Sequence, residues 1–136
     1  MTAPVVDAQP IIAAIKAAVT ASGVLFSEGV KPPGIGNRPY IVGFFDSGTI
    51  DNRSLAGRDG FSLVGTFHCA GLTPESARVA VRRLRSAVLG LHLTVAGGRQ
   101  FQRPEHLVGL PMQRDDDADP ALFIAVEEWR FRATPA

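Results

Sequence analysis

The sequence predicts one α+β domain over residues 1–136: a roughly four-stranded mixed or antiparallel sheet, two helices on one face and a small β-hairpin. Hydrophobic residues make up 46% of the 136 residues and charged residues 20%, which is typical of a globular chain large enough to bury a core. Two segments carry apolar residues at helical spacing, and the segments around them are rich in β-branched and aromatic residues.

The first helix is predicted over residues 5–22. Pro10 is tolerated only near a helix start, where its missing N–H costs little, and Gly23 suits the position beyond the end. One apolar stripe recurs at helical spacing: Ile11, Ile12, Ile15, Ala18 and Val19.

Three strands are predicted next, over residues 24–30, 39–45 and 58–70. The segment 31–39 between the first two holds prolines and glycines that favour a loop. The polar segment 46–57 is long for a hairpin connection, and we expect a loop there. The third strand alternates, with one face formed by Phe61, Leu63, Phe67 and Cys69.

The second helix is predicted over residues 74–89. Thr73 is the expected N-cap, Pro74 fits the first helical position, Glu75 favours the positive helix end, and Gly90 ends the helix. Its apolar face is expected to contain Ala77, Ala80, Val81, Leu84 and Val88.

The rest of the chain supplies a hairpin and a last strand. Residues 91–103 form two short arms around Gly97 and Gly98, residues 104–119 are expected to be irregular, and residues 122–132 form the last strand. Residues 122–126 are apolar on both faces of that strand. Beyond them Trp129 and Phe131 share one face, opposite Glu128, Arg130 and Arg132.

Two helices suffice to cover one face of such a sheet, because strands lie about 4.8 Å apart and a helix is about 10 Å wide. No predicted element is left for the other face, although residues 40–45 and 122–126 are apolar on both sides. An uncovered apolar face usually binds a partner, so the sequence predicts self-association.

The sequence contains no catalytic or ligand-binding motif, and we expect neither an enzyme nor a cofactor. His68, His92 and His106 lack metal-ligand spacing and are interpreted as ordinary polar residues. The only cysteine, Cys69, is expected to be a buried thiol. Glu127 and Glu128 are neighbours on a strand, so they face opposite ways and cannot act as an acid–base pair.

Two other patterns are too weak to predict a site. The aspartate run that contains Asp115, Asp116 and Asp117 lacks the glycine and distal glutamate of a calcium loop, so a solvated acidic loop is expected. Gly34 and Gly36 are not followed by a third glycine that opens a helix.

Charge and hydropathy narrow the class further. The net charge is +1, whereas nucleic-acid binders more often show a basic excess. Neither a signal peptide nor an apolar run of the about 20 residues that span a bilayer is present in the sequence, which predicts a soluble protein made in a reducing cytoplasm.

Candidate interaction residues come from charged patterns. Arg78, Arg82 and Arg85 are spaced i, i+4 and i+7, which leaves two interpretations: a solvated helix face, or contact with an acidic neighbour such as the aspartate run of another copy. The 46–57 loop is also an expected contact surface, because recognition residues often lie on such loops. The remaining candidates are Asp46, Asp51, Arg53, Arg58, Asp115, Asp116, Asp117 and Trp129.

Three segments resemble the tail terminator (tail completion, head–tail joining) proteins of long-tailed bacteriophages. They are Arg38-Pro39-Tyr40 opening a hydrophobic strand, the strand from Phe61 that leads into GLTPESARVAVRRLRSAVLG, and the closing RDDDADPALFIAVEEWRFRATPA. With the order of the elements they cover most of the chain, and no single motif is diagnostic.

The resemblance implies a structural virion protein without catalysis, located in the virion neck and assembled in the host cytoplasm. Such proteins form a ring, typically a homohexamer, that stops polymerisation of the tail tube and presents a surface to the head connector. The 46–57 loop is then the expected contact between rings. The implied partners are therefore further copies of the chain, the tail tube protein and the head-completion protein, with no membrane. DNA passes through the central hole without sequence-specific binding.

Two alternatives remain open. One is another neck or head-completion ring protein, distinguished by copurification with the portal rather than the tube. The other is a small α/β enzyme or ligand-binding domain, which needs a pocket with convergent polar groups that the sequence does not indicate.

Overall fold

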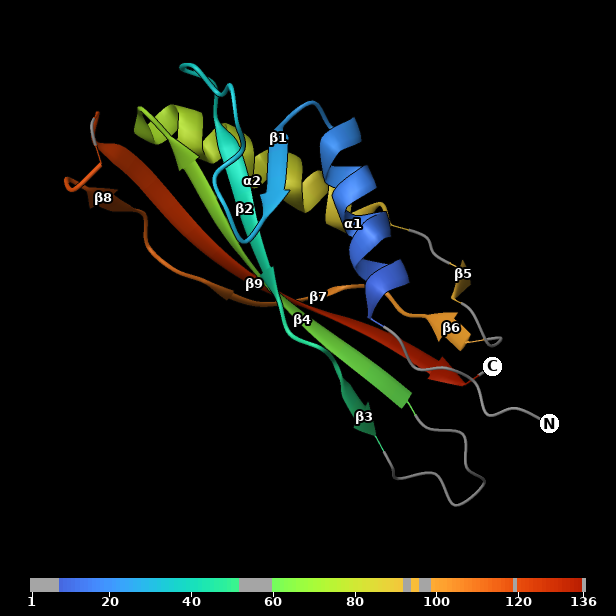
Figure 1. Cartoon of the computed structure of the whole chain (residues 1–136). Helices are drawn as coiled ribbons and strands as arrows, with labels where there is room; N and C mark the ends of the chain where they lie inside the picture. The colour runs from blue at the N-terminus through green and yellow to red at the C-terminus, as the bar shows by residue number, and fades with distance from the viewer. Residues whose placement is uncertain (1–7, 52–59, 92–93, 96–98, 119, 136) are drawn as a thin grey trace.

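The computed structural model describes residues 8–51, 60–91, 94–95, 99–118 and 120–135, and it has the predicted α+β architecture. Two helices lie on one face of a mixed sheet, and the opposite face carries no described helix (Figure 1). The elements are α1 (Gln9–Ala21), β1 (Leu25–Glu28), β2 (Tyr40–Phe45), β3 (Thr49–Asp51), β4 (Gly60–Gly71), α2 (Pro74–Leu89), β5 (Thr94–Val95), β6 (Arg99–Phe101), β7 (Glu105–Gly109), β8 (Gln113–Asp115) and β9 (Leu122–Pro135).

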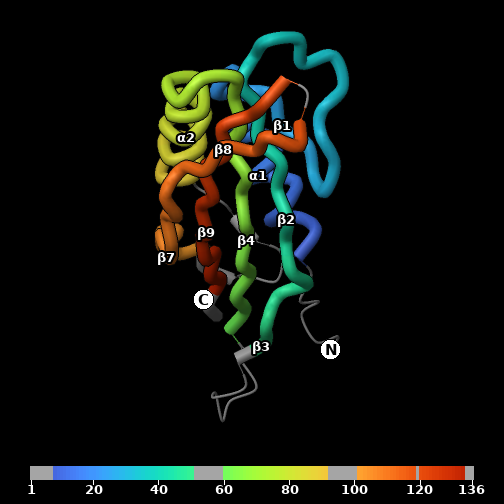
Figure 2. Tube along the Cα trace, turned by 90° about the vertical axis from the view of Figure 1, so that its left-hand side faces the viewer, coloured from blue at the N-terminus to red at the C-terminus, as the bar shows by residue number. Residues whose placement is uncertain are grey.

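The long antiparallel pair of β4 and β9 forms the centre of the sheet. The path runs β1-β2-β4-β9-β6-β5, with β3 added to β4 and both β7 and β8 added to β9. Strand β1 is parallel to β2, and the other pairs are antiparallel. Figure 2 shows β7, β9, β4 and β2 side by side, with β8 crossing one end.

The sheet has nine described strands instead of about four, because the predicted hairpin joins it through the pairing of β6 with β9 and because three further strands were not predicted. Residues 104–119 were predicted to be irregular, which is wrong, because β7 and β8 both pair with β9. The expected 46–57 loop contains β3, whose Thr49 lies opposite Ser62 of β4. The turn between the two arms of the hairpin, at residues 97–98, lies outside the described residues, but β5 and β6 do pair.

A short bulge connects β2 to β3. The Asp46 carboxylate accepts hydrogen bonds from the backbone N–H groups of Gly48 and Val64, at 2.9 and 3.1 Å. Gly48 has φ of +85°, and a Cβ there would meet the Phe61 ring at 2.1 Å, so both the backbone and the space require glycine. Asp46 is therefore a structural residue of the bulge.

Both helices end as predicted. Thr73 accepts a hydrogen bond from the backbone N–H of Ser76 at 3.1 Å, Pro74 opens α2, and Gly90 is its C-cap. Gly23 follows α1 with φ of +92°. The described part of α1 begins at Gln9, several residues after the predicted start.

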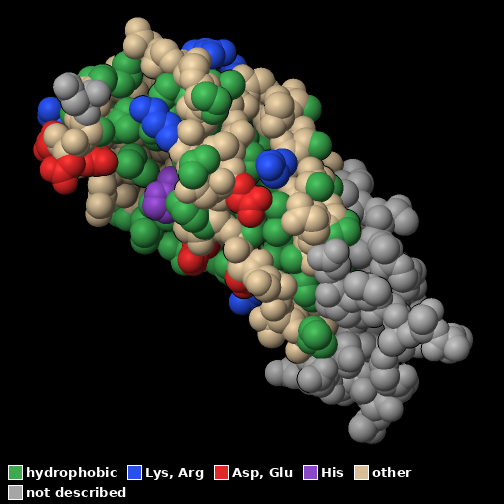
Figure 3. All heavy atoms as spheres, viewed as in Figure 1, with side chains coloured by type: hydrophobic (Ala, Val, Ile, Leu, Met, Phe, Trp, Pro, Cys, Tyr) green, Lys and Arg blue, Asp and Glu red, His purple; other side chains and the backbone are tan. Residues whose placement is uncertain are grey.

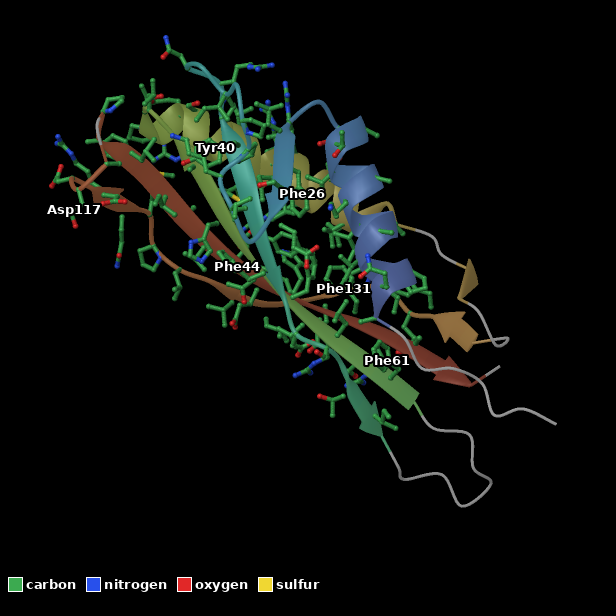
Figure 4. All side chains as sticks on the ribbon, in the orientation of Figure 1. Phe26, Tyr40, Phe44, Phe61, Asp117 and Phe131 are labelled. Atoms are coloured by element: carbon green, nitrogen blue, oxygen red, sulfur yellow. The ribbon has the colours of Figure 1, made fainter. Side chains whose placement is uncertain are left out.

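The core lies between the helices and one face of the sheet. Phe67 of β4 is fully buried at its centre, with ring centroids 6.2 Å from Phe26, 5.5 Å from Phe45 and 6.5 Å from Phe131. In Figure 4, Phe26 and Phe131 lie on the helix side of the strands and Phe44 lies on the other side. Four of the five residues predicted for the apolar face of α2 are fully buried in this core: Ala77, Ala80, Leu84 and Val88.

Candidate assembly surfaces

Side chains on the open face of the sheet, the face without helices, form rows across β2, β4 and β9. Val42, His68 and Val126 make one row, and Tyr40, Ala70 and Ile124 make the next. Phe44 stands in the following row, beside Thr66 and Glu128; it is 45% exposed, and its ring meets His68 edge-on at 5.2 Å. This half of the face is therefore an apolar surface, as the sequence predicted.

The other half of the open face is polar. Thr66 and Glu128 lie opposite each other across β4 and β9, and Arg130 pairs with Glu105 of β7 at 3.6 Å. The apolar rows thus lie toward the end of the sheet where β8 lies, and Phe44 marks their boundary with the polar half. Tyr40 at that end is buried, with the Lys31 ammonium 5.7 Å from its ring centroid. Burial, and to a lesser extent the Asp115 carboxylate, raises the pKa of Tyr40.

A cleft of about 330 Å³ separates the β8 segment from the open face. Leu110, which lines it, is 52% exposed. The other lining residues are His68, Pro111, Gln113, Arg114, Asp115, Ile124 and Val126. The cleft extends the apolar surface under the β7–β8 connection and adds charged groups at its rim.

A second cleft, of about 510 Å³, lies on the helix side between α2 and the β7–β8 connection. We call it the arginine cleft. Three guanidinium groups on successive turns of α2 line one wall, and the rest of the lining is apolar. The lining residues are Arg78, Val81, Arg82, Arg85, Leu110, Met112 and Ala125.

A buried carboxylate lies beside the arginine cleft. Glu127 of β9 is 2% exposed and is the one buried charged residue among those the structure describes. Its Oε1 accepts a hydrogen bond from Arg85 Nε at 2.5 Å, and Oε2 lies 3.1 Å from Arg85 Nη2 and 2.7 Å from His106 Nε2. These contacts join α2, β7 and β9.

The environment of Glu127 sets its charge state. Burial acts to raise its pKa, but the hydrogen bonds from Arg85 and then His106 more than offset this, so the pKa of Glu127 lies below its ordinary value. The same carboxylate raises the pKa of Arg85. Burial, chiefly, raises the pKa of the Cys69 thiol nearby, as expected for the predicted structural cysteine.

The third surface is the acidic turn, residues 115–118, between β8 and β9. Asp116 is 73% exposed and pairs with Arg114, itself 61% exposed, at 2.6 Å. Asp115 accepts a hydrogen bond from the backbone N–H of Asp117 at 3.1 Å. Figure 3 shows acidic side chains gathered at this end of the molecule, and Figure 4 shows Asp117 at its tip.

The structure changes the interpretation of two predicted interaction residues. Trp129 is 2% exposed on the helix-facing side of β9, with its ring centroid 4.9 Å from that of His106, so it belongs to the core and its prediction as a contact residue is wrong. Its Nε1 has no described hydrogen-bond partner. Arg85 pairs with Glu127 of its own chain. It is therefore neither a fully solvated side chain nor the partner of an acidic group on another copy, the two interpretations that the sequence left open.

Of the other predicted interaction residues, those not yet placed divide into two groups. Arg78 and Arg82 are exposed in the arginine cleft. Arg53 and Arg58 lie outside the described residues, and only the backbone of Asp51, at the end of β3, is described. Of the three histidines, His68 and His106 have the contacts given above, and His92 lies outside the described residues.

Glu127 is the residue of this site that the sequence analysis missed. It is two positions from Trp129 on a predicted strand, which places it on the same face as the apolar side chains. A carboxylate with that placement indicates a buried ion pair. Within the described ranges, no three His, Cys, Asp or Glu residues are grouped to hold a metal ion, and none of the helices is long and apolar enough to cross a membrane.

No family model matches the chain, and no curated protein matches it significantly. Chains of solved structures do match it. One match is a chain in the structure described as the virion of a native gene transfer agent particle. The similarity covers 88% of this chain and 84% of the other, with a TM-score of 0.58 and 17% sequence identity. The two chains therefore share a fold.

Proposed function

We propose that the chain is a structural virion protein that forms a homohexameric ring at the head-proximal end of a phage tail tube, stops tube polymerisation and joins the tail to the head connector. The observation that supports this proposal is the fold shared, over most of both chains, with a chain of a gene transfer agent virion. The three sequence segments that resemble tail terminators support the same role.

The surfaces of the chain suit a protein that assembles. Phe44 on the open sheet face is 45% exposed, and Leu110, which lines the cleft beside β8, is 52% exposed, so large apolar side chains are available for contact. The proposed partners are further copies of the chain, the tail tube protein and the head-completion protein. The proposed location is the virion, after assembly in the host cytoplasm.

The experiment that tests this function is tube polymerisation in the presence of the purified chain. Tubes grown from the cognate tube protein are expected to stop elongating when the chain is added at a stoichiometry of one ring per tube end. Unchanged tube growth, together with copurification with the portal, would favour the alternative of a different neck or head-completion ring protein.

The segment that contains residues 46–57 remains our proposed contact between rings. Asp46 and β3 belong to the sheet, so the appropriate change is replacement of residues 52–57 by a Gly/Ser linker of the same length. We expect unchanged thermal stability and reduced head–tail joining. Normal joining by this variant would refute the assignment of this segment.

A further inference from the structure

Two cationic groups of the arginine cleft have no partner among the described residues. Arg85 has Glu127, and the neighbouring Arg83 donates to the carbonyl of Gly23 at 3.0 Å. Arg78 and Arg82 make no hydrogen bond or ion pair with any residue that the structure describes. They are one helical turn apart, so their like charges repel and destabilise α2 slightly. An anion bound between them would remove that repulsion.

The rest of the cleft limits which anion fits. Its floor is apolar, formed by Val81, Met112 and Ala125, and its rim includes the half-exposed Leu110. A volume of about 510 Å³ is within the roughly 300–1,000 Å³ of small-ligand sites. A short peptide segment with adjacent carboxylates and small apolar residues fits this lining, because the carboxylates can pair with the arginines and the apolar residues can contact the floor.

The chain carries such a segment on another surface. In the acidic turn, Asp116 and Asp117 are exposed and are followed by Ala118. The ion pair between Asp116 and Arg114 is exposed and contributes at most about 1 kcal/mol to stability. Replacing Arg114 by an arginine of another copy as the partner of Asp116 therefore costs little. Figure 2 shows the β8 segment leading away from α2 across the end of the sheet, toward β1.

We propose that the arginine cleft binds the acidic turn of a second copy of the chain, with Asp116 and Asp117 placed at Arg78 and Arg82. The cleft and the turn are different surfaces, so the contact is head-to-tail. Contacts of that type close into a ring or continue as a filament. That the contacts close into a ring rests on the proposed function. The inference adds which two surfaces of the chain form each contact of that ring.

The test reverses the charge on each surface separately. The variants are Arg78→Glu/Arg82→Glu, Asp116→Lys/Asp117→Lys and the combination of all four changes in one chain. Sedimentation velocity at low and high salt measures self-association in solution. Electron microscopy measures ring occupancy at tube ends, and it is needed in case the chain assembles only on a tube. The control for the cleft variant is Lys16→Glu/Arg103→Glu, which makes the same charge change outside the cleft.

Each two-residue variant is expected to weaken self-association, or occupancy at tube ends, by at least about tenfold, because like charges then face each other. High salt is expected to weaken the wild-type contact. The four-residue variant is expected to regain most of the wild-type association. A mixture of the two two-residue variants is expected to recover assembly with the two variants alternating, because each cleft then meets a turn of opposite charge.

Three results would overturn the inference. The first is wild-type assembly by both two-residue variants. The second is a four-residue variant no better than the two-residue variants, with circular dichroism showing that all are folded. The third is an Arg78→Glu/Arg82→Glu variant that forms normal rings which no longer bind tubes. That result would assign the cleft to contact with another virion protein and would leave the proposed function intact. A wild-type chain that neither associates nor binds tube ends would instead contradict the proposed function.

Discussion

Replacement of Glu127 by glutamine tests the buried ion-pair cluster that joins α2, β7 and β9. The change keeps the shape of the side chain but removes the charge that Arg85 and His106 contact at 2.5 and 2.7 Å. Breaking a fully buried pair costs about 3–5 kcal/mol. Arg85 is 49% exposed and His106 is 39% exposed, so water compensates part of the loss, and we expect about 2 kcal/mol.

The measurement is thermal and urea unfolding at neutral pH. A loss of about 2 kcal/mol in a domain of this size lowers Tm by roughly 6–10 °C. Glu128→Gln is the matched control, because Glu128 is the adjacent residue on the opposite face and its one described contact is a 3.4 Å hydrogen bond from Thr66. The control is expected to change the free energy of unfolding by less than about 0.5 kcal/mol.

The pH dependence gives an independent check. The folded-state pKa of Glu127 is lowered, so its contribution is present above the unfolded-state pKa of about 4.3 and is lost as the pH falls through the folded-state pKa. The stability difference between wild type and Glu127→Gln should therefore shrink below about pH 4. Equal effects of the Glu127 and Glu128 changes, or a difference that stays constant down to pH 3, would refute the ion-pair interpretation.

Three further predictions concern the bulge, a helix cap and the open face. Gly48→Ala should cost about 2 kcal/mol or more and Gly29→Ala about 1 kcal/mol in urea unfolding, because both have positive φ but only Gly48 meets a buried ring; equal losses would contradict this. Thr73→Ala should lower stability by about 1 kcal/mol and Thr73→Ser by much less, since serine keeps the capping oxygen. Phe44→Asp should leave Tm within about 2 °C yet reduce ring assembly, and normal rings would exclude this face as an interface.

The features predicted correctly from the sequence depend on local rules. The cap at Thr73, the stop at Gly90 and the buried stripe of α2 follow from residue types a few positions apart. The alternation in β4 placed Phe61, Leu63, Phe67 and Cys69 on one buried face for the same reason. These elements fixed the α+β class and the helix-covered face.

The features that were missed depend on distant partners. Strand β7 has the residues EHLVG, which are mostly exposed and do not alternate, and it is a strand because it pairs with β9. Strand β8 has three residues and pairs with the same strand. The pairing of Arg85 with Glu127 likewise joins residues 42 positions apart, so helical spacing alone grouped Arg85 with Arg78 and Arg82.

The most direct test of the proposed function is electron microscopy of cognate tail tubes incubated with the purified chain. We predict a ring of six copies on one end of each tube and no further growth from that end. Bare ends on tubes that continue to lengthen, with the chain remaining free in solution, would contradict it.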